Sequence, residues 1–74
     1  MNTYVIRITT IDNLYTDYIV EAKNLFMAKI KAKNTFFRDY PNANDKIKLS
    51  LSEPTPKIIT EIVNIIKEGK LKWL

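Results

Sequence analysis

The side chains that could do acid–base or metal chemistry in this chain are its eight carboxylates. Asp39 and Asp45 flank the segment YPNAN, residues 40–44, and could together approach a hard cation. A calcium-binding loop, however, needs several oxygen ligands at alternating positions and a glycine for its sharp turn, and this segment lacks that pattern. We therefore interpret the two acids as solvated loop residues, and we expect no metal site and no cofactor.

The residue types that are absent exclude most of the remaining chemistry. The chain has no histidine, no cysteine and a single glycine. Catalytic triads and zinc sites need imidazole or thiolate groups, and phosphate-binding loops need several glycines. Lys29 and Lys33 could act as nucleophiles only if they were desolvated, and lysine stems that lie on apolar surface explain them more simply. We expect a protein that is not an enzyme.

One segment mixes cations with aromatic residues, namely FMAKIKAKNTFFRDY, residues 26–40, in a chain of net charge +4. A basic, aromatic surface is typical of nucleic-acid binding. On a helix, however, Lys31 is predicted to lie on the outer side, away from Lys29 and Lys33, so the three lysines cannot share one phosphate backbone. Nucleic-acid binding is therefore the alternative hypothesis, and its candidate residues are Lys23, Lys31, Arg38, Arg7, Lys46 and Lys48.

The favoured hypothesis is binding to another protein, because the chain has more large apolar residues than one small core absorbs. Tryptophan is a frequent anchor of protein interfaces, although Trp73 could equally belong to a tail folded back on the core. The partner is another protein or a second copy of this chain. The interface candidates are Trp73, Leu71, Leu74, Phe26, Ile30, Phe37, Val5 and Ile19.

Three segments alternate apolar and polar residues as half-buried strands do, at residues 3–10, 16–22 and 45–53. Asp12 and Asn13 predict a turn that joins the first two into a hairpin. The inward-facing residues of the third segment are predicted to be Ile47, Leu49 and Leu51.

Two helices are predicted from caps and from apolar spacing. The first begins after Asn24 and stops before Pro41. It carries one apolar stripe (Leu25, Ala28, Ala32 and Phe36) and beside it a second stripe (Phe26, Ile30 and Phe37), for which the sequence leaves open whether the second helix or another chain covers it. The second helix begins at Thr55 and Pro56 and ends at Gly69, with a continuous apolar face of Ile58, Ile59, Ile62, Val63, Ile65 and Ile66.

The order of elements is ββαβα, and we expect residues 1–74 to form one small α+β domain. If the crossover is right-handed, the third strand lies parallel to the second, most simply across the first, and the sequence leaves the strand order open. Both helices are predicted to cover one face of this three-stranded sheet, and residues 70–74 could add a fourth strand. The longest apolar stretch, residues 58–66, is too short for a membrane span, and we expect a soluble, cytoplasmic protein.

The residue choice also carries a hint of origin. Isoleucine, lysine and asparagine are frequent, and their codons are rich in A and T. We expect a low-GC genome and a small accessory or inhibitory protein of viral or mobile-element type.

Overall fold

A computed structural model describes residues 1–43 and 46–68 of the chain. Its elements are β1 (Asn2–Thr10), β2 (Tyr15–Ala22), α1 (Leu25–Asp39), β3 (Ile47–Leu51) and α2 (Pro56–Lys67). The ββαβα order and the α+β class are therefore confirmed. The predicted end of the second helix at Gly69, and the possible fourth strand at residues 70–74, lie outside the described residues.

The three strands form one sheet in the order β2-β1-β3, with β1 antiparallel to both neighbours. Consequently β3 runs parallel to β2 across β1, as the crossover rule predicts. Asn13 has a φ of 63° in the turn between β1 and β2, which confirms the left-handed position expected there.

Helix α1 packs on the sheet face formed by the even-numbered residues of β1 and β2. Ile6, Ile8 and Val20 are fully buried beneath it. From α1 come Ala28 and Ala32, whose short side chains let the helix approach the strands closely, and Phe36. The first predicted stripe is thus the core stripe. On β3, Ile47 and Leu49 pack against this core, but Leu51 at the end of the strand is exposed.

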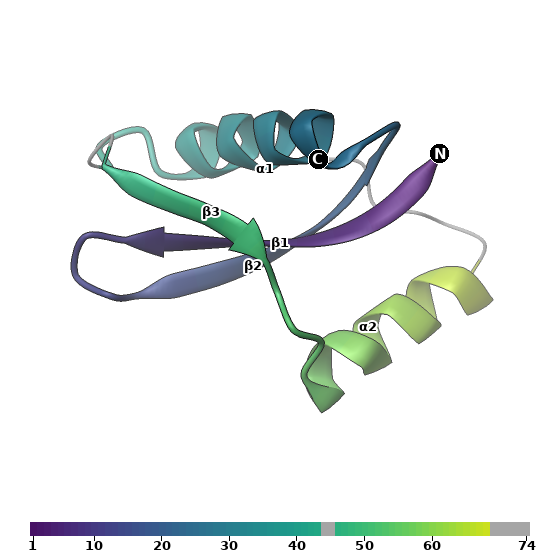
Figure 1. Cartoon of the computed structure of the whole chain (residues 1–74). Helices are drawn as coiled ribbons and strands as arrows, with labels where there is room; N and C mark the ends of the chain where they lie inside the picture. Colours follow the sequence, from purple (N-terminus) through teal and green to yellow (C-terminus); the bar gives the residue numbers. More distant parts are fainter. Residues whose placement is uncertain (44–45, 69–74) are drawn as a thin grey trace.

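The prediction that both helices share one face is wrong. Figure 1 shows α1 along one side of the sheet and α2 on the other side. Three strands about 4.8 Å apart are spanned by a single helix of about 10 Å diameter, so α1 alone fills its face. Ile58 of α2 is buried, as is Val5 on the odd-numbered face of β1.

Helix α2 is only loosely attached to the rest of the described structure. Within residues 1–43 and 46–68, the backbone of α2 does not pack closely along α1 or along any of the three strands. Two local features define where it begins: Thr55 accepts a hydrogen bond from the Ile58 amide, and Pro56 occupies the first turn. Both were predicted from the sequence.

Candidate protein-binding surfaces

The second stripe of α1, which we call the outer stripe (Phe26, Ile30 and Phe37), is partly exposed to solvent. Phe26 is 70% exposed and Ile30 is 37% exposed, while Phe37 packs partly against the core. Phe37 also makes an edge-to-face contact with Phe36, with ring centroids 5.3 Å apart. Since α2 lies on the other side of the sheet, it does not cover the outer stripe (Figure 1).

A second exposed apolar surface lies on α2 and was not identified from the sequence. Ile59, Val63 and Ile66 are 49%, 42% and 64% exposed, and we call them the α2 ridge. The neighbouring stripe of Ile58, Ile62 and Ile65 is buried or half-buried. The sequence did contain an indication of this surface, because the predicted isoleucine face of the second helix is wider than the stripe that one helix–sheet contact buries.

The other interface candidates have different surroundings. Val5 is buried and Ile19 is half-buried. The odd-numbered sheet face is therefore partly covered, whereas the prediction that both helices lie on the other face would leave it in solvent. Trp73, Leu71 and Leu74 lie outside the described residues. Phe26 and Ile30 are therefore the predicted candidates that the structure describes as exposed.

The six cations of the alternative hypothesis are not brought together. The prediction that Lys31 lies on the outer side of α1 is wrong: its side chain is half-buried, and Nζ donates to the Glu21 carbonyl of β2 at 2.8 Å. Arg7 is on the opposite side of the sheet from α1. Lys23 precedes α1, Arg38 is in its last turn, and Lys46 and Lys48 lie at β3.

Arg7 is engaged within its own sheet face. Its Nε and Nη2 donate to the Asp17 carboxylate at 3.0 and 3.2 Å, and its guanidinium stacks 4.1 Å from the centroid of the Tyr15 ring. Hydrogen bonding to Asp17 raises the pKa of Arg7 above its usual value. The pair was missed from the sequence, although a hairpin centred on Asp12 places residues 7 and 17 opposite each other.

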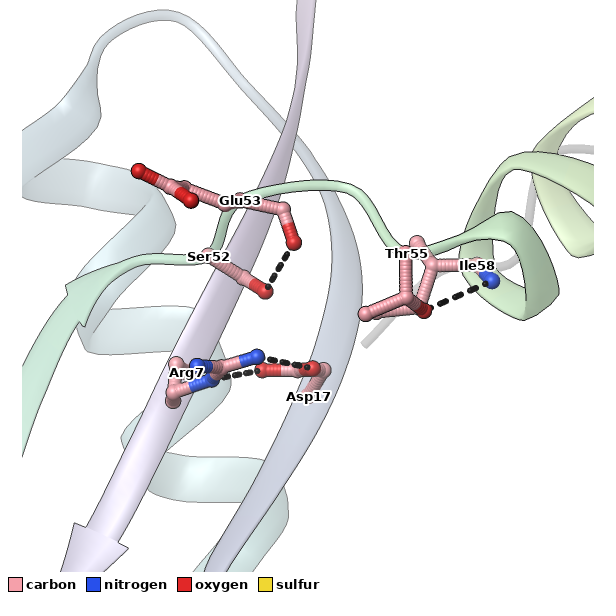
Figure 2. A network of polar contacts seen from close by, with 6 residues as sticks. All are labelled: Arg7, Asp17, Ser52, Glu53, Thr55 and Ile58. Carbon is pink, nitrogen blue, oxygen red and sulfur yellow. Dashed lines mark hydrogen bonds and ion pairs between the residues drawn. The ribbon is translucent and has the colours of Figure 1, made fainter.

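The segment between β3 and α2 passes over this ion pair. The Ser52 amide donates to the Val5 carbonyl at 2.8 Å and so extends the β1–β3 ladder by one bond. The Ser52 hydroxyl donates to the Glu53 carbonyl at 3.3 Å. Figure 2 shows the Ser52–Glu53 bond, the Arg7–Asp17 pair and the Thr55 cap of α2. The ladder therefore extends to Ser52, and the chain from there to the Thr55 cap connects it to α2.

Two open cavities are present in the described part of the molecule. One, of about 580 Å³, lies between the hairpin turn and the end of α1 and is lined by Leu14, Phe36 and Tyr40 among others. The other, of about 590 Å³, is lined by residues of β2, α1 and α2. The second cavity contains more polar groups, including Asp17, Asp39 and Glu61.

Nothing in residues 1–43 and 46–68 gathers three or more acids into a metal-ligand cluster. Asp39 is 3.6 Å from Arg38, with which it forms an exposed ion pair, and Asp45 lies outside the described residues. No helix in the described ranges is long and apolar enough to cross a membrane.

Comparison of the chain with protein-family models, with curated proteins and with solved structures gave no match. Any functional conclusion therefore depends on the geometry described above.

Proposed function

We propose that the protein acts without catalysis, by docking on another protein through the outer stripe of α1. The observation that supports this proposal is the exposure of Phe26 and Ile30 on the side of α1 that faces away from the sheet. Aromatic and aliphatic side chains that fill a pocket on a partner supply most of the binding energy of protein interfaces. An accessory or inhibitory role is the biological function that fits such stoichiometric binding.

The distribution of cations favours a protein partner over a nucleic acid. Phosphate binding needs several cations on one continuous surface. In this fold Arg7 is bonded to Asp17, and the Lys31 ammonium is bonded to the Glu21 carbonyl. Lys33 and Arg38 of α1 are exposed, but their spacing of five residues puts them on different sides of the helix.

An affinity pull-down from nuclease-treated lysate, followed by binding measurements with the purified captured protein, tests the proposal. The variant is the double change Phe26→Ser and Ile30→Ser, and the control is Asn34→Ser at another exposed position of the same helix. We expect the double change to weaken binding by about 2 kcal/mol or more. The control should leave the affinity unchanged, and the melting temperatures of the double variant and the control should stay close to that of the unaltered protein.

Two results would argue against this function. Equal affinity of the double variant and the unaltered protein for the captured partner would remove the outer stripe as the docking surface. Capture that disappears entirely after nuclease treatment, with binding to DNA that weakens steeply as salt rises, would support the nucleic-acid alternative instead.

A further inference from the structure

Strand β2 is an edge strand, and the hydrogen-bond register shows which of its backbone groups face outward. The Thr10 amide donates to the Leu14 carbonyl, so residues 10 and 14 form a hydrogen-bonded pair of the antiparallel ladder. Such pairs alternate along a ladder. The even-numbered residues of β2 therefore bond to β1, and the amide and carbonyl groups of Asp17 and Ile19 point away from the sheet.

An independent contact confirms this alternation. The Lys31 ammonium reaches from α1 to the carbonyl of Glu21, the next odd-numbered residue of β2. That carbonyl is thus on the outer edge and already has a donor. Within the described sheet, β1 is the one strand that pairs with β2, which leaves the outward groups of Asp17 and Ile19 without a neighbouring strand.

Asp17 and Ile19, which carry these outward groups, are among the residues that line a cavity of about 590 Å³, which we call the edge groove. Asp17, Tyr18 and Ile19 belong to the strand, Thr35, Arg38 and Asp39 to α1, and Glu61, Asn64 and Ile65 to α2. The groove is thus lined from both helices, which lie on opposite sides of the sheet (Figure 1), and from the edge strand β2. The volume is within the range of about 300–1,000 Å³ that is typical of ligand sites.

The charge of the edge groove is opposite to that of the whole protein. Its lining has three carboxylates, on Asp17, Asp39 and Glu61, and one guanidinium, on Arg38. Arg7 neutralises Asp17 and Arg38 pairs with Asp39, so Glu61 is the lining carboxylate that the ion pairs of the described residues leave uncompensated. The chain as a whole has a net charge of +4. Tyr18, Ile19 and Ile65 add apolar surface next to the carboxylates. The groove therefore complements a segment in which cationic and apolar side chains alternate, as they do on the two faces of a strand.

We propose that the edge groove binds an extended, basic segment of a partner protein, which pairs with β2 as an additional strand. Main-chain hydrogen bonds to Asp17 and Ile19 supply the pairing, and contacts with Glu61 and Ile65 of α2 select the side chains, as in other cases of strand addition. The edge groove is separate from the outer stripe, so this inference is independent of the function proposed above.

Nuclear magnetic resonance titration of the full chain with synthetic octapeptides tests the inference. The probe is a capped peptide of alternating lysine and valine. A second peptide has glutamate in place of lysine, and a third has the lysine–valine sequence with methylated backbone nitrogens. We expect the first peptide to shift the amide signals of Asp17 and Ile19 and to slow their hydrogen exchange. The acidic peptide should bind at least about tenfold more weakly, and the methylated peptide should lose the exchange protection.

Charge reversal on α2 gives the matched comparison. Glu61→Lys changes a groove residue, whereas Glu68→Lys makes the same change just beyond the helix and outside the lining. We expect Glu61→Lys to weaken binding of the basic peptide by about threefold to tenfold and Glu68→Lys to have a smaller effect. Both positions are exposed, so neither change should unfold the protein.

Several results would overturn the inference. Equal binding of the basic and acidic peptides would show that charge does not select the occupant. Signal changes confined to Phe26 and Ile30 would place the peptide on the outer stripe instead. Concentration-dependent shifts of Asp17 and Ile19 without peptide would identify a second copy of the chain as the occupant.

Discussion

Arg7 and Asp17 face each other across β1 and β2 and form a two-bond ion pair on the sheet face that α2 partly covers. The Asp17 side chain is only 11% exposed, so its carboxylate is largely removed from water. It therefore depends on Arg7 for the hydrogen bonds and the compensating charge that a buried carboxylate needs. The pair also fixes the hairpin register, because a shift of one residue would place Arg7 opposite a residue on the other face.

We predict that Arg7 and Asp17 are energetically coupled. Arg7→Met and Asp17→Asn should each lower the melting temperature, and the double variant should lose less than the sum of the two single changes. Arg7→Met alone should be the more harmful change, because it leaves the Asp17 carboxylate half-buried without its cation. Thermal unfolding of the four proteins at low and high salt measures the coupling. Strictly additive losses at low salt would show that the pair does not contribute as a unit.

The Tyr18 hydroxyl gives the protein a predicted weakness at alkaline pH. Burial raises the pKa of Tyr18 above its ordinary value of 10.0, and the nearby negative charge of Asp39 adds to this effect. As the pH rises past that ordinary value, the phenol ionises first in the unfolded chain, so the free energy of unfolding falls. The stability that this group contributes is complete below about pH 9 and is lost as the pH approaches its folded pKa.

Urea unfolding at several values between about pH 8 and about pH 11 should therefore differ between the unaltered protein and Tyr18→Phe. The two should have similar stability near neutrality, and the variant should lose stability less steeply above about pH 10. Parallel curves over the whole range would contradict the raised pKa.

Asn24 is predicted to stabilise α1 through its side chain. Its Oδ1 accepts a hydrogen bond from the Met27 amide at 2.9 Å, in the position of an N-cap. Asn24→Ala should lower the free energy of unfolding by about 1 kcal/mol. Asn34→Ala, in the middle of the same helix and exposed, is the control and should be neutral or slightly stabilising, since alanine favours helix. An equal loss in both variants would mean that the cap has no special role.

The contact between α1 and the sheet should not tolerate a larger side chain at Ala32. Ala32 is fully buried, and it faces strands whose Ile6 and Ile8 are also fully buried. Ala32→Leu should destabilise the fold by about 1–3 kcal/mol through overpacking. The same change at an exposed helix position, Asn34→Leu, should not. Denaturant unfolding measures both, and an unchanged midpoint for Ala32→Leu would show that the helix can move away from the sheet at little cost.

The elements that could be predicted from sequence are those with local causes. The positions of β1 and β2 were predicted from the strict alternation of apolar and polar residues. The starts of the two helices were predicted from Asn24, Thr55 and Pro56, because capping depends on only a few neighbouring residues. The position of β3 across β1 was the simplest arrangement for a right-handed crossover, although the sequence left the strand order open. The core stripe of α1 was also evident, because its small residues repeat at helical spacing.

What could not be predicted depends on contacts between distant residues. The side of the sheet that α2 takes is decided by how much area α1 already covers, which no periodicity reports. Lys31 was predicted to point outward because helical spacing places it on the side of α1 opposite Lys29 and Lys33. Its long side chain nevertheless reaches the edge of the sheet, where the ammonium donates to the Glu21 carbonyl. The exposure of Phe26 and Ile30 likewise became clear only once α2 was located (Figure 1).

Helix α2 is predicted to open more readily than the rest of the molecule, and its N-cap should control that opening. Thr55 Oγ1 accepts from the Ile58 amide at 3.3 Å, and few contacts to other elements support the helix. Thr55→Ala should cost about 1 kcal/mol of helix stability, which corresponds to about fivefold faster amide hydrogen exchange within α2. The amides of β1 and β2 should exchange as before.

Thr60→Ala is the matched control for this prediction, because Thr60 Oγ1 donates to the Pro56 carbonyl inside the same helix at 2.9 Å. That bond competes with helical geometry, and alanine has the higher helix propensity, so this change should leave exchange in α2 unchanged or make it slower. If Thr55→Ala instead accelerates exchange equally in α2 and in the buried strands, α2 unfolds only with the whole domain. The α2 wall of the edge groove would then be as firmly held as the sheet, since its opening would require the loss of the core around Ile6 and Val20.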